Sequence, residues 1–494
     1  MLLTKIIKKK KFSNIDGYNF LFFILLIILS INSSFLDVQR IFEIKFNISI
    51  NYFFSLLNAI RFFFPLLTLL LLLIFIKKTH YTKIFEHKFY LLFIFYFLFQ
   101  LLVYPKFYLE HDWSYIQLAS NGFIFSLICL LSLKENFKYF YKNILIIAIT
   151  IFSTLSLYLS FKILYQAIDI GNSYLYWSSA LSPTGTILGA PNPRVTGLSR
   201  TLLIFFVLIF FSIQRFNKVI KILAYITLFY ISFVLYGMQT RGAMIGIAIF
   251  LFIYLFFVSD LFLIKTLKIF LLIILPIISW ENLIANKILH NGSSVFITQD
   301  DRNDRDDRGD QDDLNDRDDI GTIFLYTEKS VNSRIFNDGN IKLDTSGRVE
   351  IWKLALKLIK DNKIVFGFGP QGDRQLFNFY RQKKLNTVQS IKWSTNVSNG
   401  YIYSYLSAGI LGLSIALIAT IILIKEVFVA VFINKIFRKN IDQNYLSIFC
   451  IIFLCTRTLF ENGLFYFSID YIFILISYLN VYIFNNNLKN NIIK

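Results

Sequence analysis

Residues 62–76 of the chain read FFFPLLTLLLLLIFI, an apolar run without a charged side chain. Similar runs recur through a sequence of 494 residues, of which 56% are hydrophobic and only 16% are charged. Because a soluble domain carries about 25% charged residues, this composition excludes a soluble globular enzyme, an extracellular disulfide scaffold and a disordered protein. The recurring runs predict an all-α, polytopic membrane protein.

The apolar runs predict about twelve membrane-spanning helices of roughly 17–25 residues each. They cover residues 18–34, 52–76, 88–104, 116–133, 143–165, 199–214, 222–237, 243–258, 266–280, 400–424, 444–459 and 465–485. The two runs on either side of Arg241 are also compatible with a single re-entrant unit. The chain is thereby divided into a membrane region of about nine helices at 1–280, a loop region at 281–399 and a membrane region of about three helices at 400–494.

The basic residues predict how these helices are oriented. The chain has 50 Lys and Arg against 31 Asp and Glu, a formal net charge of +19. Lys and Arg gather in the loops that the span pattern assigns to the inner side, and they are scarce in the short outer loops. Since basic residues favour the cytoplasmic side, both termini are expected to be cytoplasmic. The positive charge is therefore mainly a topology signal and requires no nucleic-acid partner.

Two outer segments are long, at 166–198 and 281–399. Within the second, residues 300–319 contain eleven Asp and four Arg, and such a charged tract without apolar periodicity predicts a disordered insertion. A Ca²⁺ site is the alternative, because Asp is a suitable ligand, although the spacing differs from that of an EF-hand loop. The three Cys and four His show no disulfide or metal-site spacing, so neither a metal nor another cofactor is expected.

An amphipathic helix is predicted just after the acidic tract. Residues 344–347 offer N-cap side chains. The apolar residues that follow at helical spacing are Val349, Trp352, Leu356 and Ile359. The glycines of residues 367–370 end the helix. Arg348 lies in its first turn, where a cation opposes the helix dipole, so an anion bound at the free amides would resolve the conflict. An ordinary surface arginine is the alternative.

Further arginines are predicted at the same outer face. Arg241 lies in a very short turn between two apolar runs, and Arg194 lies just before a span. Arg457 is one helical turn from Glu461, with which it is expected to pair. Such a group suits a diphosphate ligand, because guanidinium binds phosphate oxygens in a bidentate manner and keeps its charge. For Arg241, a side chain that merely reaches the membrane interface is the alternative.

Several short segments resemble the O-antigen ligase/polymerase family. They are QTRG at 239–242, TSGRVEIW at 345–352, GFGP at 367–370 and SNGY at 398–401, which runs into GILG at 409–412. The order of these segments, and the large outer loop before the last three spans, match the family together. The resemblance extends over residues 190–465 and is best at 345–412.

The resemblance implies a metal-independent, inverting glycosyltransferase of the bacterial inner membrane, in which residues 281–399 are a periplasmic loop between helices 9 and 10. Its donor would be a glycan on undecaprenyl diphosphate. Its acceptor would be the lipid A core, for a ligase, or another lipid-linked repeat unit, for a polymerase. The residues expected to be catalytic are Arg241, Arg348 and Ser398. Those expected to bind the diphosphate or the glycan are Arg194, Gly347, Glu350, Asn399 and Arg457.

Ser398 marks a departure from the ligase pattern. That pattern has a His followed by a small polar residue and, at fixed spacing, by two small residues. Here Ser398 stands at the His position, with Asn399, Gly409 and Gly412 in register. A Ser hydroxyl cannot act unaided as a general base near neutral pH. Either another group takes that role or the acceptor differs, which favours the polymerase. The groups available for the role are Glu350, Glu461, His290 and His111.

Two other functions are compatible with the sequence. A transporter or flippase of twelve spans would carry charged or broken helices at the middle of the membrane, and the candidate charges are Arg61, Lys162 and Asp470. A glycan-binding or assembly subunit without activity of its own is the second, because of the Ser398 departure.

Overall fold

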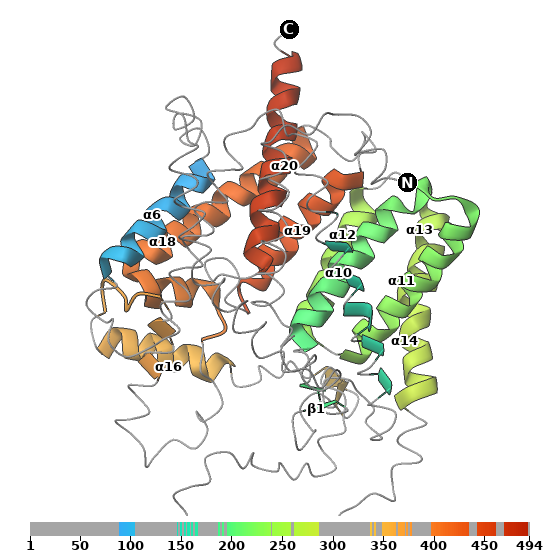
Figure 1. Cartoon of the computed structure of the whole chain (residues 1–494), viewed down its shortest axis with the longest axis horizontal. Helices are drawn as coiled ribbons and strands as arrows, with labels where there is room; N and C mark the ends of the chain where they lie inside the picture. The colour runs from blue at the N-terminus through green and yellow to red at the C-terminus, as the bar shows by residue number, and fades with distance from the viewer. Residues whose placement is uncertain are drawn as a thin grey trace, which may run out of the picture. The chain divides into compact units, whose positions relative to one another are not determined.

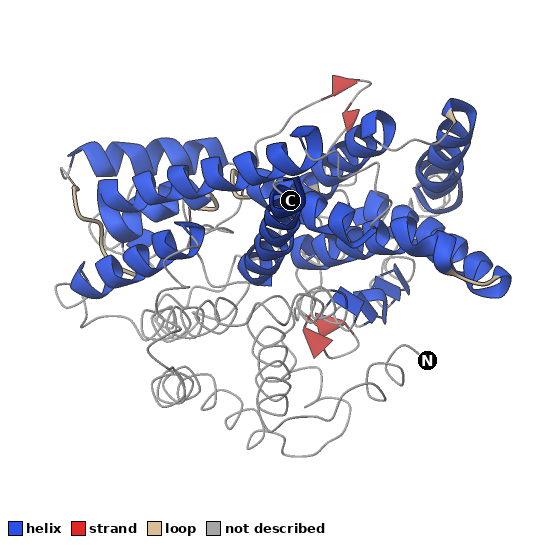
Figure 2. Ribbon diagram, turned by 90° about the horizontal axis from the view of Figure 1, so that it is seen from above, coloured by secondary structure: helices blue, strands red, loops and turns tan. Residues whose placement is uncertain are grey.

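The computed structural model describes residues 88–103, part of 146–165, 186–187, 190–191, 195–238, 240–257, 261–285, 336–337, 340–341, 348–361, 364–370, 372–373, 376–377, 397–433, 442–460 and 469–492. The predicted spans at 18–34, 52–76 and 116–133 and the acidic tract at 300–319 lie outside these residues. The described secondary structure is helical apart from two antiparallel pairs of two-residue strands, drawn as short arrows in Figure 2. The pairs are β1 (Thr186–Ile187) with β2 (Ala190–Pro191) and β3 (Phe336–Asn337) with β4 (Asn340–Ile341).

Eight of the predicted spans coincide with described apolar helices. Within the described part of the chain, four segments are long and apolar enough to cross a membrane, namely Leu198–Arg215, Lys218–Met238, Phe262–Ile284 and Gly400–Ile433. Four shorter apolar helices cover Lys88–Gln100, Gly242–Phe257, Asn444–Arg457 and Phe473–Asn486. The total of twelve spans and the orientation of the termini stay predictions.

The chain divides into two compact units. The first, called here the α10 unit, consists of residues 153–247 and 260–344. Its helices are α10 (Val195–Ser212), α11 (Lys218–Met238), the start of α12 (Arg241–Phe257), α13 (Phe262–Ile269), the π-helical η4 (Phe270–Ile274), α14 (Leu275–Trp280) and the π-helical η5 (Glu281–Ala285). Helix α11 packs against both α10 and α14. Gly237 on α11 leaves room for the indole of Trp280, since a Cβ atom there would lie 2.3 Å from the ring.

The second unit, called here the α18 unit, consists of residues 1–152, 248–259 and 345–494, so that the predicted loop region is shared between the two units. Its main helices are α6 (Lys88–Val103), α16 (Arg348–Asp361), α18 (Gly400–Phe428), α19 (Asp442–Arg457) and α20 (Ile469–Ile492). Helix α6 lies beside α18 (Figure 1). It also contacts α20 through aromatic rings, with centroids of Phe89 and Tyr478 4.5 Å apart. Tilted ring pairs of this kind add to the burial of apolar surface.

Helix α16 confirms the predicted amphipathic helix and part of its predicted apolar face, because Trp352 and Ile359 pack against a buried core cluster. Leu356, which the sequence pattern places on the apolar face, is 55% exposed. Ala355 and Leu358 are buried instead, and Ile351 packs against the same core cluster. These three positions follow the four- and three-residue steps of one helix face. The apolar pattern therefore identified Trp352 and Ile359 correctly, placed Leu356 wrongly and overlooked the small Ala355.

Candidate active site

Helix α18 is interrupted near its N-terminal end. The backbone leaves helical geometry at Ala408 (φ −140°, ψ 20°) and Gly409 (φ 62°, ψ −154°). An interruption frees carbonyl and N–H groups that would otherwise bond within the helix, and such groups are costly to leave unpaired in an apolar environment. The chain itself supplies their partners, through a segment called here the strap (residues 364–370 and 372–373).

The strap places its own backbone in the interruption. Three hydrogen bonds join the two segments: from the Phe368 N–H to the Leu406 carbonyl (2.7 Å), from the Gly369 N–H to the Ser407 carbonyl (2.9 Å) and from the Ile410 N–H to the Val365 carbonyl (3.0 Å). The hydroxyl of Tyr405 adds a bond to the carbonyl of Ile364, at 2.7 Å. Polar groups released by the interruption are therefore paired with the strap.

Two glycines make this close approach possible. Gly367 of the strap and Gly409 of α18 both have positive φ angles, 79° and 62°. A Cβ atom at Gly367 would lie 2.6 Å from the nitrogen of Gly409, so the two backbones touch where side chains would otherwise stand. The family-like segments at 367–370 and 409–412 thus form one structural junction, which their separation in the sequence does not reveal.

The turn before α18, residues 397–400, is called here the Ser398 turn. Ser398 has φ 46° and is the one non-glycine residue with a positive φ in the described part of the chain. That conformation is unfavourable for a residue with a side chain, so its surroundings must hold it. On the N-terminal side of the turn, hydrogen bonds fix both the backbone N–H and the backbone carbonyl of Val397. Its N–H donates to Oδ2 of Asp373 at 3.1 Å, and its carbonyl accepts from Nε1 of Trp352 at 2.9 Å.

On its C-terminal side, the Ser398 turn is fixed by Asn399 and Gly400. Oδ1 of Asn399 caps α18, because it accepts the N–H groups of Tyr401 and Ile402, both at 3.0 Å. Nδ2 of Asn399 donates to the carbonyl of Leu459 at 2.9 Å. The N–H of Gly400 donates to the carbonyl of Thr458 at 2.8 Å. The side chain of Asn399 is therefore engaged in positioning the turn against the end of α19.

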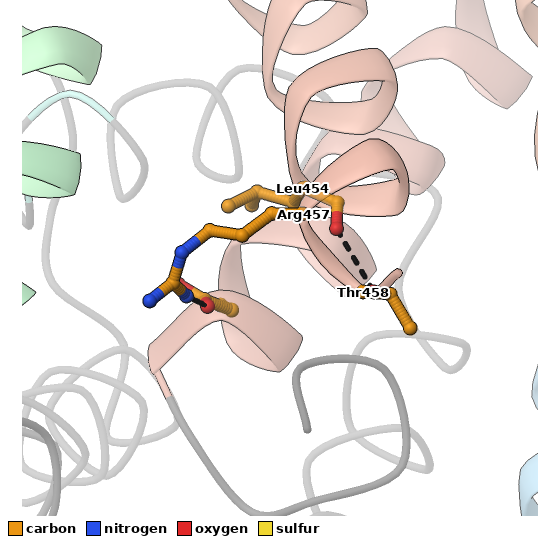
Figure 3. A network of polar contacts seen from close by, with 4 residues as sticks. Leu454, Arg457 and Thr458 are labelled. Atoms are coloured by element: carbon orange, nitrogen blue, oxygen red, sulfur yellow. Dashed lines mark hydrogen bonds and ion pairs between the residues drawn. The ribbon is translucent and has the colours of Figure 1, made fainter. Parts of the chain in front are cut away.

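Arg457, the last residue of α19, lies next to these contacts and is 8% exposed. Its guanidinium forms a hydrogen-bonded ion pair with Asp470, the second residue of α20. In Figure 3 the Arg457 side chain extends to one side, while Thr458 lies on the other and bonds back to Leu454. The expected partner, Glu461, lies outside the described residues.

The predicted site residues fall into two groups. In the α18 unit, Ser398 and Asn399 share one turn, which bonds to Thr458 and Leu459, the two residues that follow Arg457 at the end of α19. Arg348 is the first residue of α16, and Trp352, one helical turn later, bonds to Val397. The structure therefore brings these elements together. Glu350 lies in the first turn of α16, and Gly347 lies outside the described residues.

The second group belongs to the α10 unit. Arg241 is the first residue of α12. The preceding Thr240 donates its hydroxyl hydrogen bond to Oγ of Ser199 on α10, at 2.8 Å, which ties the starts of α12 and α10 together. Arg194 lies outside the described residues, directly before Val195, where α10 begins.

Asp373 and Arg200 are buried charged residues that the sequence analysis did not identify. Asp373 is 1% exposed, and no periodic pattern marks it because it follows the glycine-rich part of the strap. Arg200 is 5% exposed and lies within α10. A charged residue inside an apolar run is the signal that could have identified Arg200. Among the described residues, no three His, Cys, Asp or Glu side chains gather in a way that could hold a metal ion.

Comparison with known proteins gives one match. A search of curated proteins finds no match. Residues 226–417 match the family model for O-antigen ligase. The matched range contains α12, α16, the strap and the Ser398 turn. The match supports the O-antigen ligase/polymerase family, whose glycosyltransferase-like membrane enzymes act on lipid-linked glycans in polysaccharide biosynthesis.

Proposed function

We propose that the protein transfers a glycan from undecaprenyl diphosphate to an acceptor hydroxyl at the periplasmic face of the bacterial inner membrane. The acceptor is another lipid-linked repeat unit, for a polymerase, or the lipid A core, for a ligase. The observation that carries the proposal is the Ser398 turn. Ser398 is held there in an unfavourable conformation, beside the helix that Arg348 begins, within the part of the chain that matches the O-antigen ligase family.

The proposed reaction is a direct displacement. The acceptor hydroxyl attacks the sugar C1 from the face opposite the diphosphate, so the C1–O bond breaks with inversion and charge develops on the leaving diphosphate. The proton of the hydroxyl passes to water or to the leaving diphosphate. Fixed cations in a poorly hydrated site stabilise that charge more than water does. Because these cations belong to the protein, the reaction requires no metal ion.

Arg241 and Arg348 are the proposed diphosphate ligands. Each is the first residue of a helix, where N–H groups without an intrahelical partner add partial positive charge. A guanidinium at a helix start opposes the dipole of its own helix, and a bound diphosphate removes that conflict. Arg194, directly before α10, is proposed as a third contact, and Gly347 and Glu350 are proposed to lie against the donor at the start of α16.

The remaining predicted residues are assigned by their contacts. Asn399 is engaged in three hydrogen bonds that shape the turn, and Arg457 is paired with Asp470. We assign both to positioning the Ser398 turn. Ser398 is proposed to face the acceptor. Because Ser398 stands where the ligase pattern has a His that can assist deprotonation, the polymerase reaction is the preferred one.

A transporter is supported less well. The interruption of α18 is the feature that a transporter could use to coordinate an ion through free backbone groups. Here, however, backbone groups at the interruption are bonded to the strap. Of the charges considered for transport, Asp470 is paired with Arg457, and Arg61 and Lys162 lie outside the described residues.

The test is a transfer assay with purified protein, a synthetic glycan on undecaprenyl diphosphate and a matching acceptor. We expect transfer to persist in EDTA and to fall at least tenfold in Arg241→Ala and in Arg348→Ala. Lys357 is an exposed cation on the same helix as Arg348, so Lys357→Ala is the matched control and should retain full activity. Full activity of both arginine variants would overturn the proposal.

A further inference from the structure

Asp373 is a buried carboxylate in the strap, with 1% of its surface exposed. Its Oδ2 accepts the N–H of Val397 at 3.1 Å, which places the carboxylate one residue away from Ser398. Transfer of a carboxylate from water to the protein interior is unfavourable unless its bonds compensate. An apolar residue would fill the same space without that cost, so the carboxylate is expected to have a specific task.

That task concerns the backbone of the Ser398 turn. A residue with φ 46° relaxes to a more favourable conformation unless its neighbours are fixed. On the C-terminal side, the cap of α18 and the bonds to α19 fix Asn399 and Gly400. On the N-terminal side, Asp373 holds the Val397 N–H and Trp352 holds its carbonyl. Asp373 and Trp352 thus fix, from its two sides, the peptide before Ser398.

The position of Asp373 is itself tightly determined. Gly372, which precedes it, lies so close to α18 that a Cβ atom would stand 2.4 Å from the carbonyl oxygen of Leu406. Its N–H donates to the carbonyl of Gly369 at 3.1 Å. The strap is in turn bonded into the interruption of α18. The interruption, the strap, Asp373 and the Ser398 turn therefore form one connected chain of contacts.

We infer that Asp373 is a positioning residue for glycan transfer, whose carboxylate holds the Ser398 turn in the conformation that presents Ser398 to the acceptor. This inference rests on the proposed function. It gives the family-like segments 367–370 and 409–412 a joint role, since together they fix the carboxylate that fixes Ser398. The property of Asp373 that matters is the side-chain oxygen that accepts the Val397 N–H.

The test compares Asp373→Ala and Asp373→Asn by two measurements, amide hydrogen exchange of peptides covering residues 397–400 and steady-state transfer kinetics. Asp373→Ala should raise the exchange rate at least tenfold and lower kcat at least tenfold. Its KM should stay within threefold of the wild-type value. Asp373→Asn keeps an oxygen that can accept the Val397 N–H, so it should restore protection and at least a third of kcat. Asp361→Asn, an exposed acid at the end of α16, is the control and should match the wild-type protein.

The following outcomes would contradict all or part of the inference. An unchanged exchange rate in Asp373→Ala, or a kcat within twofold of wild type while Arg348→Ala is tenfold slower, would overturn it and leave the proposed function standing. If Asp373→Ala does not fold, Asp373→Asn decides, because a kcat below a tenth of wild type would show that hydrogen bonding is not its role. Absence of transfer by the wild-type protein would overturn the proposed function and the catalytic part of this inference, while exchange still reports whether Asp373 holds the turn.

Discussion

Gly409 of α18 and Val365 of the strap touch through their backbones, and a Cβ atom at Gly409 would lie only 1.9 Å from the carbonyl oxygen of Val365. The same carbonyl accepts the N–H of Ile410 at 3.0 Å. The helix interruption and the strap are therefore interdependent. Without the strap the interrupted helix would have unpaired backbone groups, and without Gly409 the strap could not approach.

Gly409→Ala should consequently disrupt the junction. The positive φ alone costs an Ala about 1–3 kcal/mol, and the overlap with Val365 adds to it. We expect a lower unfolding temperature in detergent and loss of transfer. Ser414→Ala, at an exposed position on the same helix, is the control and should leave both unchanged. An unfolding temperature equal to that of the wild-type protein would contradict the described junction.

The ion pair between Arg457 and Asp470 gives a second prediction. Both side chains are buried, so Asp470→Asn leaves an uncompensated charge on Arg457 and should destabilise the protein by about 3–5 kcal/mol. The double variant Arg457→Met, Asp470→Leu removes both charges and should recover most of that loss. Thermal unfolding of Arg457→Met, of Asp470→Leu and of the double variant measures the coupling. Purely additive effects would show that the two residues do not interact.

Apolar patterning predicted helix positions well and helix ends less well. Helix α20 continues to Ile492, beyond the predicted end at 485, through polar residues that follow the apolar run. Hydropathy reports what can lie in lipid, whereas helix length also depends on propensity and packing. The π-helical turns at 270–274 and 429–433 leave no mark in an apolar run.

The candidate site was predictable as a set of segments but not as a geometry. The resemblance selected Arg348, Ser398 and the glycine-rich segments, which the structure then connects. It did not indicate that the strap enters the interruption of α18, because this depends on contacts between residues about forty positions apart. Asp373 was missed for the same reason, since its partner Val397 is identified only once the strap is in place.

Ser398 allows conformation and chemistry to be separated. Glycine adopts positive φ without a steric cost, so Ser398→Gly should unfold at the wild-type temperature or slightly above it, yet it should transfer more slowly because the hydroxyl is lost. Ser398→Val places a β-branched residue at positive φ and should lose about 1–3 kcal/mol of stability. Unfolding temperature and kcat of both variants provide the measurement. Equal destabilisation by Gly and Val would contradict the described turn, and full activity of Ser398→Gly would exclude a role for the hydroxyl.

Deletion of the gene, followed by gel analysis of lipopolysaccharide, distinguishes the two candidate acceptors. Because Ser398 replaces the His of the ligase pattern, we expect the polymerase result, in which the lipid A core carries a single repeat unit and long chains are lost. A ligase would instead leave the core without repeats, while lipid-linked polymer accumulates. Complementation with the wild-type gene should restore the ladder of long chains, and complementation with Arg348→Ala should not. An unchanged ladder after deletion would show that the protein does not make the O-antigen of that strain.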